Sequence, residues 1–317
     1  MDDSSGTILV VGYNACDVLV PFEGVPEVDA KHEVQPIQIC GGGPGATAAV
    51  ALARLGADVR LVTPLTDDMA GQMQRSELSA AGVDISWCPT VRGHESPKAV
   101  ILVDPTTAER TIFWSRGTVP LLDPDAVDPE AWDGVRMLYS DGHEIPTAIK
   151  FARVARQHGL KVVLDAGNVR EGTRELVRLC TDVITSAVFA PLFTGHTDPL
   201  AALLEIRNLG PERVGMTRGA AGVLALVEQE LVQVPAFVIP AVDTTGAGDV
   251  FHAAYAHALH SGLGFLECLE FGCAAAAIKC CGNGGRGRLP GVDEVQELIR
   301  TGRRRNLDVE GRDSTVS

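Results

Sequence analysis

DTTGAGDVF, at residues 243–251, is the segment from which the architecture of this chain is best inferred. It follows a β-rich run and precedes residues 253–259, which have high helix propensity, so a glycine-rich turn opens a helix here. Small residues at Gly246, Ala247 and Gly248 let backbone N–H groups approach an anion closely, and the helix N-terminus adds partial positive charge. The segment therefore predicts a binding site for an anion.

Asp249 would lie in the first turn of that helix. A carboxylate there can accept a proton from a hydroxyl that attacks a phosphoryl group, while the amides of residues 246–248 stabilise negative charge. A structural alternative is that Asp243 and Thr245 merely cap the helix. Capping does not explain three small residues followed by a second Asp, so we favour a catalytic role for Asp249.

Upstream of this segment, short apolar runs alternate with segments of helical spacing. The strand-like runs lie at 7–12, 59–62, 137–139, 161–164 and 183–184, and the helical segments at 46–55, 70–81, 146–158 and 199–209. Further strand-like runs at 222–228 and 231–234 precede the glycine-rich turn, and two alanine-rich helices follow it. This order predicts an α/β fold with a mainly parallel sheet covered by helices on both faces.

Two stretches break the alternation, at residues 18–39 and 98–115. The second predicts a β-hairpin around the turn-rich segment 104–107. Strands outside the main sheet would form a lid or a dimer contact, and an ordinary surface hairpin is the alternative. The hairpin residues expected to close the site and to pair with a second subunit are Ile101, Val103, Ile112 and Trp114.

The chain length of 317 residues suits one large domain, at 1–300, with this lid as a smaller appendage. Residues 301–317 are expected to be a polar tail, in which Arg303, Arg304 and Arg305 are solvated rather than an anion site.

A second glycine-rich segment, CGGGPGATAA at residues 40–49, leads into a predicted helix and permits close approach by a ligand. A dinucleotide fingerprint would have to follow the first strand directly, and that strand ends at Gly12 instead.

Together, the two segments resemble the two signatures of the ribokinase-like (PfkB) carbohydrate kinase family. The resemblance implies a three-layer sandwich with a small β-strand lid, and ATP and Mg²⁺ as cofactors. The segments GGGPGATAAVA and PAFVIPAVDTTGAGDVFH are most similar to the corresponding sequences of the subgroup that contains sulfofructose kinase. The sulfonate-binding arginine of that enzyme would fall near Gly142 here, so its substrate is not transferred to this chain.

The resemblance also implies substrate contacts. These fall on Asn14, Asp17, Gly41, Gly42, Gly43, Thr47 and His143. Asn14 and Asp17 could instead be a turn-capping pair, and a lone His at a strand end is often only structural.

Nucleotide contacts are implied at Thr217, Gly219, Thr244, Ala277, Gly282 and Asn283. In many members of the family, carbonyl groups from the segment matching 282–287 bind a monovalent cation such as K⁺. Asp243 and Thr245 would be its other ligands here.

Three positions depart from the family pattern. Thr47 replaces a common Asn, and Pro44 replaces the Lys of ribokinase. The usual Asn-x-x-Glu motif, which organises Mg²⁺ and its waters, is replaced by Ser-Ala-Val-Phe at 186–189. Because Mg²⁺ binds mainly through phosphates and water, the loss of one carboxylate is tolerable, at a cost in metal affinity or rate.

Composition and charge restrict the other possibilities. A formal charge of −14 disfavours nucleic acid and anionic membranes as partners. The eight cysteines form no CxxC pair, and Cys280 and Cys281 are adjacent, so we expect reduced thiols. The sequence contains neither a signal peptide nor an apolar run that would span a membrane, which predicts a cytoplasmic protein.

These observations predict an ATP-dependent kinase that acts on a hydroxyl of a sugar or sugar-like molecule and forms a homodimer through the lid.
Two alternatives stay open: a nucleoside kinase of the same fold, and a non-catalytic sensor that binds a sugar or nucleotide.

Overall fold

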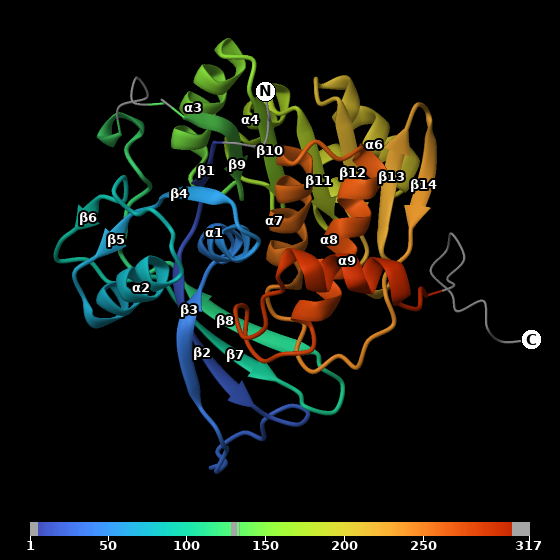
Figure 1. The fold of residues 1–317 in the computed structure, drawn as a ribbon. Helices are drawn as coiled ribbons and strands as arrows, with labels where there is room; N and C mark the ends of the chain where they lie inside the picture. Colours follow the sequence, from blue (N-terminus) through green and yellow to red (C-terminus); the bar gives the residue numbers. More distant parts are fainter. Residues whose placement is uncertain (1–5, 128–131, 133, 306–317) are drawn as a thin grey trace, which may run out of the picture.

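An eight-stranded sheet forms the centre of the protein (Figure 1), whose computed structural model describes residues 6–127, 132 and 134–305. In order across the sheet, its strands are β14 (Glu230–Val234), β13 (Val223–Val227), β12 (Arg213–Thr217), β11 (Asp182–Ser186), β10 (Lys161–Ala166), β9 (Val135–Ser140), β1 (Thr7–Val11) and β4 (Asp58–Val62). The strands from β12 to β4 pair in parallel, whereas β13 and β14 add an antiparallel edge. The predicted α/β class with a mainly parallel sheet is confirmed.

Helices cover both faces of this sheet. Successive side chains of a strand point to opposite sides, so each central strand contributes apolar side chains to both faces. In β1, Ile8 and Val10 pack with one group of helices, whereas Leu9 and Val11 pack with the other. The first group is α1 (Pro44–Arg54), α7 (Ala247–His260), α8 (Phe265–Lys279) and α9 (Val292–Thr301). The second group is α3 (Ile145–Gln157), α4 (Thr173–Leu179), α5 (Phe189–Thr194) and α6 (Pro199–Asn208). The expected three-layer arrangement is therefore present.

A separate four-stranded sheet lies below the central sheet in Figure 1. Its strands are, in order, β3 (Gln38–Gly42), β2 (Ala15–Pro21), β7 (Lys98–Val103) and β8 (Arg110–Ser115). The predicted hairpin is confirmed, because β7 and β8 pair antiparallel and Asp104 Oδ1 accepts a hydrogen bond from Thr106 N (2.8 Å) in the connection. The first two strands extend beyond the predicted stretch 18–39, since β2 begins at Ala15 and β3 ends at Gly42.

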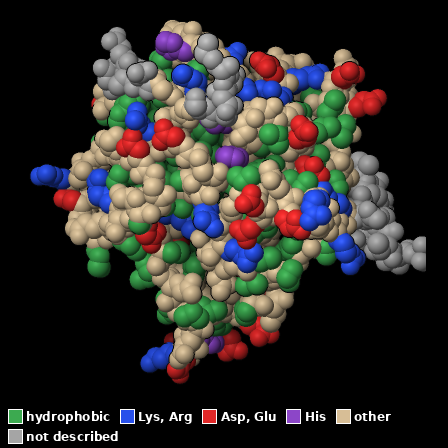
Figure 2. All heavy atoms as spheres, in the orientation of Figure 1, with side chains coloured by type: hydrophobic (Ala, Val, Ile, Leu, Met, Phe, Trp, Pro, Cys, Tyr) green, Lys and Arg blue, Asp and Glu red, His purple; other side chains and the backbone are tan. Residues whose placement is uncertain are grey.

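The two faces of this small sheet differ in burial. Leu19, Ile101 and Val103 pack together on the inner face. The expectation that Ile101 and Val103 belong to a dimer contact is wrong, because their exposed fractions are only 2% and 8%. On the outer face, the strand register aligns an apolar row, the outer row, made of Ile39, Val18, Val100 and Phe113. Figure 2 shows hydrophobic side chains over this lower part of the molecule.

Short elements complete the described fold. They are β5 (Leu65–Thr66), α2 (Met69–Ala80), β6 (Thr90–Val91), η1 (Pro124–Ala126) and η3 (Gly219–Ala221). Arg304 is docked rather than solvated, since it forms an ion pair with Glu270 and its guanidinium lies 3.8 Å from the centroid of the Phe237 ring. The tail prediction is therefore wrong for Arg304, and residues 306–317 lie outside the described residues.

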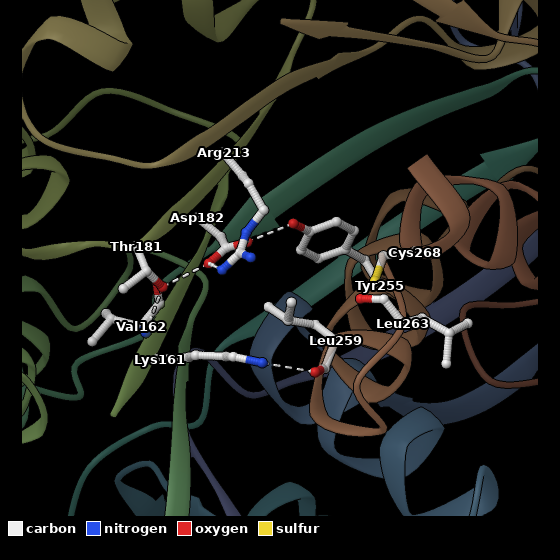
Figure 3. Close-up of polar contacts among 9 residues, drawn as sticks. All are labelled: Lys161, Val162, Thr181, Asp182, Arg213, Tyr255, Leu259, Leu263 and Cys268. Carbon is white, nitrogen blue, oxygen red and sulfur yellow. Dashed lines mark hydrogen bonds and ion pairs between the residues drawn. The ribbon is translucent and has the colours of Figure 1, made fainter. Parts of the chain in front are cut away.

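A buried carboxylate ties α7 to the start of the central strands (Figure 3). Asp182 accepts hydrogen bonds from Arg213 Nε (2.5 Å) and from the Tyr255 hydroxyl of α7 (2.5 Å). Nearby, Lys161 Nζ donates to the carbonyl of Leu259 (3.0 Å) in the last turn of α7. These contacts fix α7 at the end opposite to Asp249.

Candidate active site

The carboxyl ends of neighbouring parallel strands bring several predicted residues together. The register places the end of β1 beside the end of β9, and β9 beside β10. Asp141 follows β9, Asp165 lies near the end of β10, and both act electrostatically on Asp249 at the start of α7. Ligands of open α/β sheets bind at this edge. The candidate site is therefore built around three carboxyl groups.

Asp249 lies in the first turn of α7 and is half-buried. Its carboxylate accepts no hydrogen bond from any residue that the structure describes. Burial raises the pKa of Asp249 to about 7, and the charges of Asp165 and Asp141 act in the same direction, against His252 and Arg110. A carboxyl group with these properties is free to exchange a proton with a ligand near neutral pH.

Asp165 is the second titratable group at this edge. Burial raises its pKa to about 8, with a further contribution from the charge of Asp141, and it accepts a hydrogen bond from the Tyr139 hydroxyl (3.3 Å). His252 Nδ1 lies 3.3 Å from Asp165 and 2.7 Å from the carbonyl of Gly248, so this nitrogen carries the hydrogen. Because burial lowers the pKa of His252 to about 4, its ring is neutral at pH 7.

The glycine-rich turn has one crowded and one open position. Gly246 has φ +73°, and a Cβ there would lie 2.7 Å from Gly285 Cα, so only glycine fits. Gly248 is open, because a Cβ would meet no atom of the described residues within 4 Å. Ala247 N donates to Thr244 O (3.2 Å) and Val250 N to Gly246 O (3.0 Å), whereas the amides of Gly248 and Asp249 between them have no intrahelical acceptor. The turn therefore presents backbone donors beside open space.

Of the two predicted cation ligands, Asp243 is occupied by the protein itself. The two carboxylate oxygens of Asp243 accept hydrogen bonds from Thr245 N (2.7 Å) and Gly284 N (2.6 Å). The carbonyl of Asp243 accepts from Lys279 Nζ (2.8 Å), which also lies 3.5 Å from the carbonyl of Gly282. Thr245 Oγ1 is buried and has no partner among the described residues.

On the small sheet, Asp17 of β2 lies opposite the glycines of β3. A Cβ on Gly42 would lie 2.0 Å from Asp17 Oδ2, which explains why glycine is needed there. Burial raises the pKa of Asp17 to about 6, while Arg286 lowers it and Glu77 raises it. No described residue donates a hydrogen bond to the Asp17 carboxylate, so it can accept from the hydroxyl groups of a ligand.

Arg286 contacts the backbone of these glycines and was not predicted as a site residue. Its side chain donates to the carbonyl of Gly42 (2.8 Å) and to Thr47 Oγ1 (3.3 Å). Gly41 N donates to Glu77 (2.8 Å), which also pairs with Arg286 (3.4 Å). Thr47 therefore contacts an arginine of this chain at the position where the family pattern has Asn.

Asp141 was also missed by the sequence analysis, although it organises the floor of the site. Its carboxylate accepts hydrogen bonds from the backbone amides of Tyr13 (2.7 Å), Gly45 (2.8 Å) and His143 (2.9 Å). Asn14, beside Tyr13, donates to Gln74 Oε1 (2.5 Å), and its own Oδ1 is buried without a partner among the described residues. Gln74 Nε2 is likewise buried without a partner among the described residues.

A stack of side chains lines the site at His143. The His143 ring stacks on Tyr13 with centroids 4.6 Å apart, and Arg170 Nη2 lies 3.1 Å from His143 Nε2. On the other side, Arg116 lies over the Tyr13 ring (5.4 Å) and pairs with Glu144 (2.7 Å). Arg170 Nη1 is buried without a hydrogen-bond partner in the described part of the chain, which favours an anionic ligand group here.

The predicted nucleotide residues lie on three segments. Thr217 ends β12 and donates to the carbonyl of Thr185 (3.2 Å), and Gly219 (φ +57°) begins η3. Thr244 Oγ1 accepts from Arg110 Nη1 of β8 (2.7 Å), which links the small sheet to the glycine-rich turn. The remaining three lie at the end of α8 and in the turn after it: Ala277, Gly282 and Asn283.

The segment that replaces Asn-x-x-Glu has a structural role. Phe189 is fully buried and stacks on Phe193 with centroids 5.1 Å apart, and Ser186 Oγ accepts from Phe189 N (3.1 Å). Over the described residues, no group of three or more His, Cys, Asp or Glu side chains is placed to bind a metal ion.

Residues 6–290 match the model of the pfkB family carbohydrate kinases. A ribokinase from Bacillus subtilis is 30% identical over 296 residues, covering 92% of this chain and 99% of that protein. The crystal structure of a protein described as a ribokinase from Agrobacterium tumefaciens superposes with a TM-score of 0.87 at 26% identity, covering 93% and 98% of the two chains.

The structure of Arabidopsis thaliana ribokinase in complex with ribose and ATP superposes with a TM-score of 0.79 at 25% identity, covering 94% and 99%. In the described part of the chain, no helix is long and apolar enough to cross a membrane.

Proposed function

Because this chain belongs to the pfkB family of carbohydrate kinases, we propose that it transfers the γ-phosphoryl group of ATP to a hydroxyl of a sugar or sugar-like molecule, with Asp249 as the catalytic base. The observation that carries the proposal is the unpaired carboxylate of Asp249 beside the glycine-rich turn. The acceptor hydroxyl would give its proton to Asp249 as its oxygen bonds to the γ-phosphorus and the bond to the β-phosphate oxygen breaks, releasing ADP.

Two features of the turn support this reaction. The first-turn amides of α7 stabilise the negative charge that develops on the transferred group. The pKa of Asp249, raised to about 7, makes it a stronger base than an ordinary carboxylate while leaving a large ionised fraction at neutral pH. Mg²⁺ bound to the phosphates would neutralise part of their charge.

For the acceptor, we propose a sugar that carries an anionic group, such as a sugar acid or sugar phosphate. Asp17 and Asn14 Oδ1 supply acceptors for hydroxyl groups, and Arg170 Nη1 supplies a free donor for an anion. A nucleoside is less favoured, because the Tyr13–His143 stack is flanked by Arg116 and Arg170 and offers no free aromatic face to a base. The closer resemblance to sulfofructose kinase stays a prediction.

The test is ADP release from the purified protein with Mg²⁺, ATP and a panel of neutral sugars, sugar acids, sugar phosphates and nucleosides. We expect turnover with an anionic sugar and a loss of at least about a thousandfold in Asp249→Asn, the upper range for a general base. Calorimetric titration with MgADP controls for the mutant's binding site. Ligand binding without turnover in the wild-type protein would instead support the sensor alternative.

A further inference from the structure

Lys279 is a fully buried lysine in the last turn of α8, with an exposed fraction of 0%. Its Nζ donates to the carbonyl of Asp243 (2.8 Å) and lies 3.5 Å from the carbonyl of Gly282. A lysine is almost never fully buried unless its charge is compensated. Two backbone carbonyls, which are partial negative charges, provide that compensation here.

These two carbonyls come from the two segments that were predicted to bind a monovalent cation, namely 243–245 and 282–287. A K⁺ ion does not fit the arrangement. The Lys279 ammonium already lies between the carbonyls of Asp243 and Gly282, where an ion would have to bind, and each carboxylate oxygen of Asp243 accepts a backbone hydrogen bond. A second cation beside the ammonium would also be repelled by it.

We propose that the ammonium group of Lys279 takes the place of a monovalent metal ion, so that this protein needs no K⁺ for nucleotide binding or turnover. An ammonium carries the same single charge as K⁺ and is similar to it in size. It joins the turn after α8 to the segment that leads into the glycine-rich turn, which is the same connection that a bound ion would make.

Burial lowers the pKa of Lys279 below its ordinary value, and Arg110 acts in the same direction, whereas the charges of Asp243, Cys280 and Asp249 oppose this shift. The carbonyls of Asp243 and Gly282 are the groups that face the ammonium. The position also matters for the proposed chemistry. Because Thr245 and Gly246 follow Asp243 directly, fixing the Asp243 carbonyl fixes the entry to the first turn of α7, where the phosphate-binding amides lie.

The inference rests on the proposed function only for its catalytic half, and its first test needs no substrate. Thermal unfolding and MgADP titration of the wild-type protein are measured in potassium chloride and in tetramethylammonium chloride of equal ionic strength. We expect the same unfolding temperature and the same MgADP affinity in both salts. A saturable rise of either quantity with K⁺, absent with Na⁺, would overturn the proposal.

The second test replaces the charge. Lys279→Met keeps most of the side-chain volume, and we expect it to weaken MgADP binding by at least about tenfold, as for the loss of a charged hydrogen bond. Lys279→Ala opens space for an external ion, so K⁺, ammonium or methylammonium should partly restore its MgADP affinity and unfolding temperature, whereas tetramethylammonium should not.

Lys161→Met is the matched control, because Lys161 Nζ also binds a carbonyl of the α7 region, but at the far end of the helix (Figure 3). It should lower the unfolding temperature without changing MgADP affinity and without creating a response to K⁺. If Lys279→Met binds MgADP as the wild-type protein does, Lys279 only fills space and the proposal fails. If no acceptor is ever phosphorylated, these binding results still stand.

Discussion

At the scale of a single residue, Asp249 accepts a proton only while it is ionised. Its raised pKa, about 7, means that the carboxyl is increasingly protonated below neutral pH. Under the proposed function, kcat/KM should therefore fall about tenfold per pH unit below about pH 7 and level off above it. The measurement is the pH profile of kcat/KM with MgATP saturating, and a profile that is flat from acidic to alkaline pH would contradict the assignment.

Asp165→Asn provides the control for that profile. The pKa of Asp165, raised to about 8, keeps this carboxyl mostly protonated where Asp249 titrates, so the substitution keeps both its shape and its neutral state. The acid limb should therefore stay in place even if the maximal rate changes. A limb that moves to lower pH would mean that Asp165 is charged near pH 7 and itself raises the pKa of Asp249.

At the scale of the element, two glycines of the glycine-rich turn are expected to have different roles. Gly246 is required by the backbone conformation, and Gly248 leaves space for a phosphate. Gly246→Ala should lower the free energy of unfolding by about 1 to 3 kcal/mol, because residue 246 has positive φ and its Cβ would lie 2.7 Å from Gly285 Cα. Gly248→Ala should leave stability unchanged or slightly raised, since its Cβ meets nothing and alanine favours a helix.

The variant that keeps its stability, Gly248→Ala, should nevertheless lose function. The methyl group of Gly248→Ala enters the open space beside the first-turn amides, so ATP affinity or turnover should fall in a stable protein. Thermal unfolding and ADP release of both variants check this. Unimpaired turnover in Gly248→Ala would mean that no phosphate approaches this position.

An element could be predicted from the sequence when the residue pattern that produces it lies within the element itself. The apolar runs of the central strands and the periodicity of α1, α2, α3 and α6 are local, and those elements were predicted within a few residues. The short helices α4 and α5 were missed, because six or seven residues carry little periodicity.

The same distinction applies to the site. The glycine-rich turn and Asp249 are recognisable in nine consecutive residues. Asp141 is not, because its partners Gly45 and Tyr13 lie 96 and 128 residues away. Arg286 lies 239 residues from Thr47, and the carbonyl that Lys279 holds is 36 residues away, so both roles become visible only in the folded chain.

At the scale of the whole molecule, the small sheet has two exposed apolar surfaces with different uses. The register places Trp114 on the same face as Asp17, toward the site, and its exposed fraction is 64%. Phe113, exposed to 60%, belongs to the outer row on the opposite face. We propose that the outer row pairs with that of a second subunit, since exposed apolar rows on a sheet mark association sites.

Sedimentation at micromolar concentration should accordingly give a dimer. Phe113→Glu should shift the protein to monomer, because it places a charge in the apolar contact. Trp114→Glu, a neighbouring change of similar exposure on the other face, should leave the mass unchanged. A monomeric wild-type protein would disprove the contact.

The contacts of Asp141 also affect which part of the protein loses conformational entropy when a ligand binds. One carboxylate gathers the amides that follow β1, open α1 and follow β9, so three separate backbone segments share one anchor. This floor is held by hydrogen bonds within the chain itself, so a ligand does not have to organise it. The loss of conformational entropy on binding then falls mainly on the small sheet, which makes its stiffness, rather than the contacts of the floor, the quantity that tunes affinity.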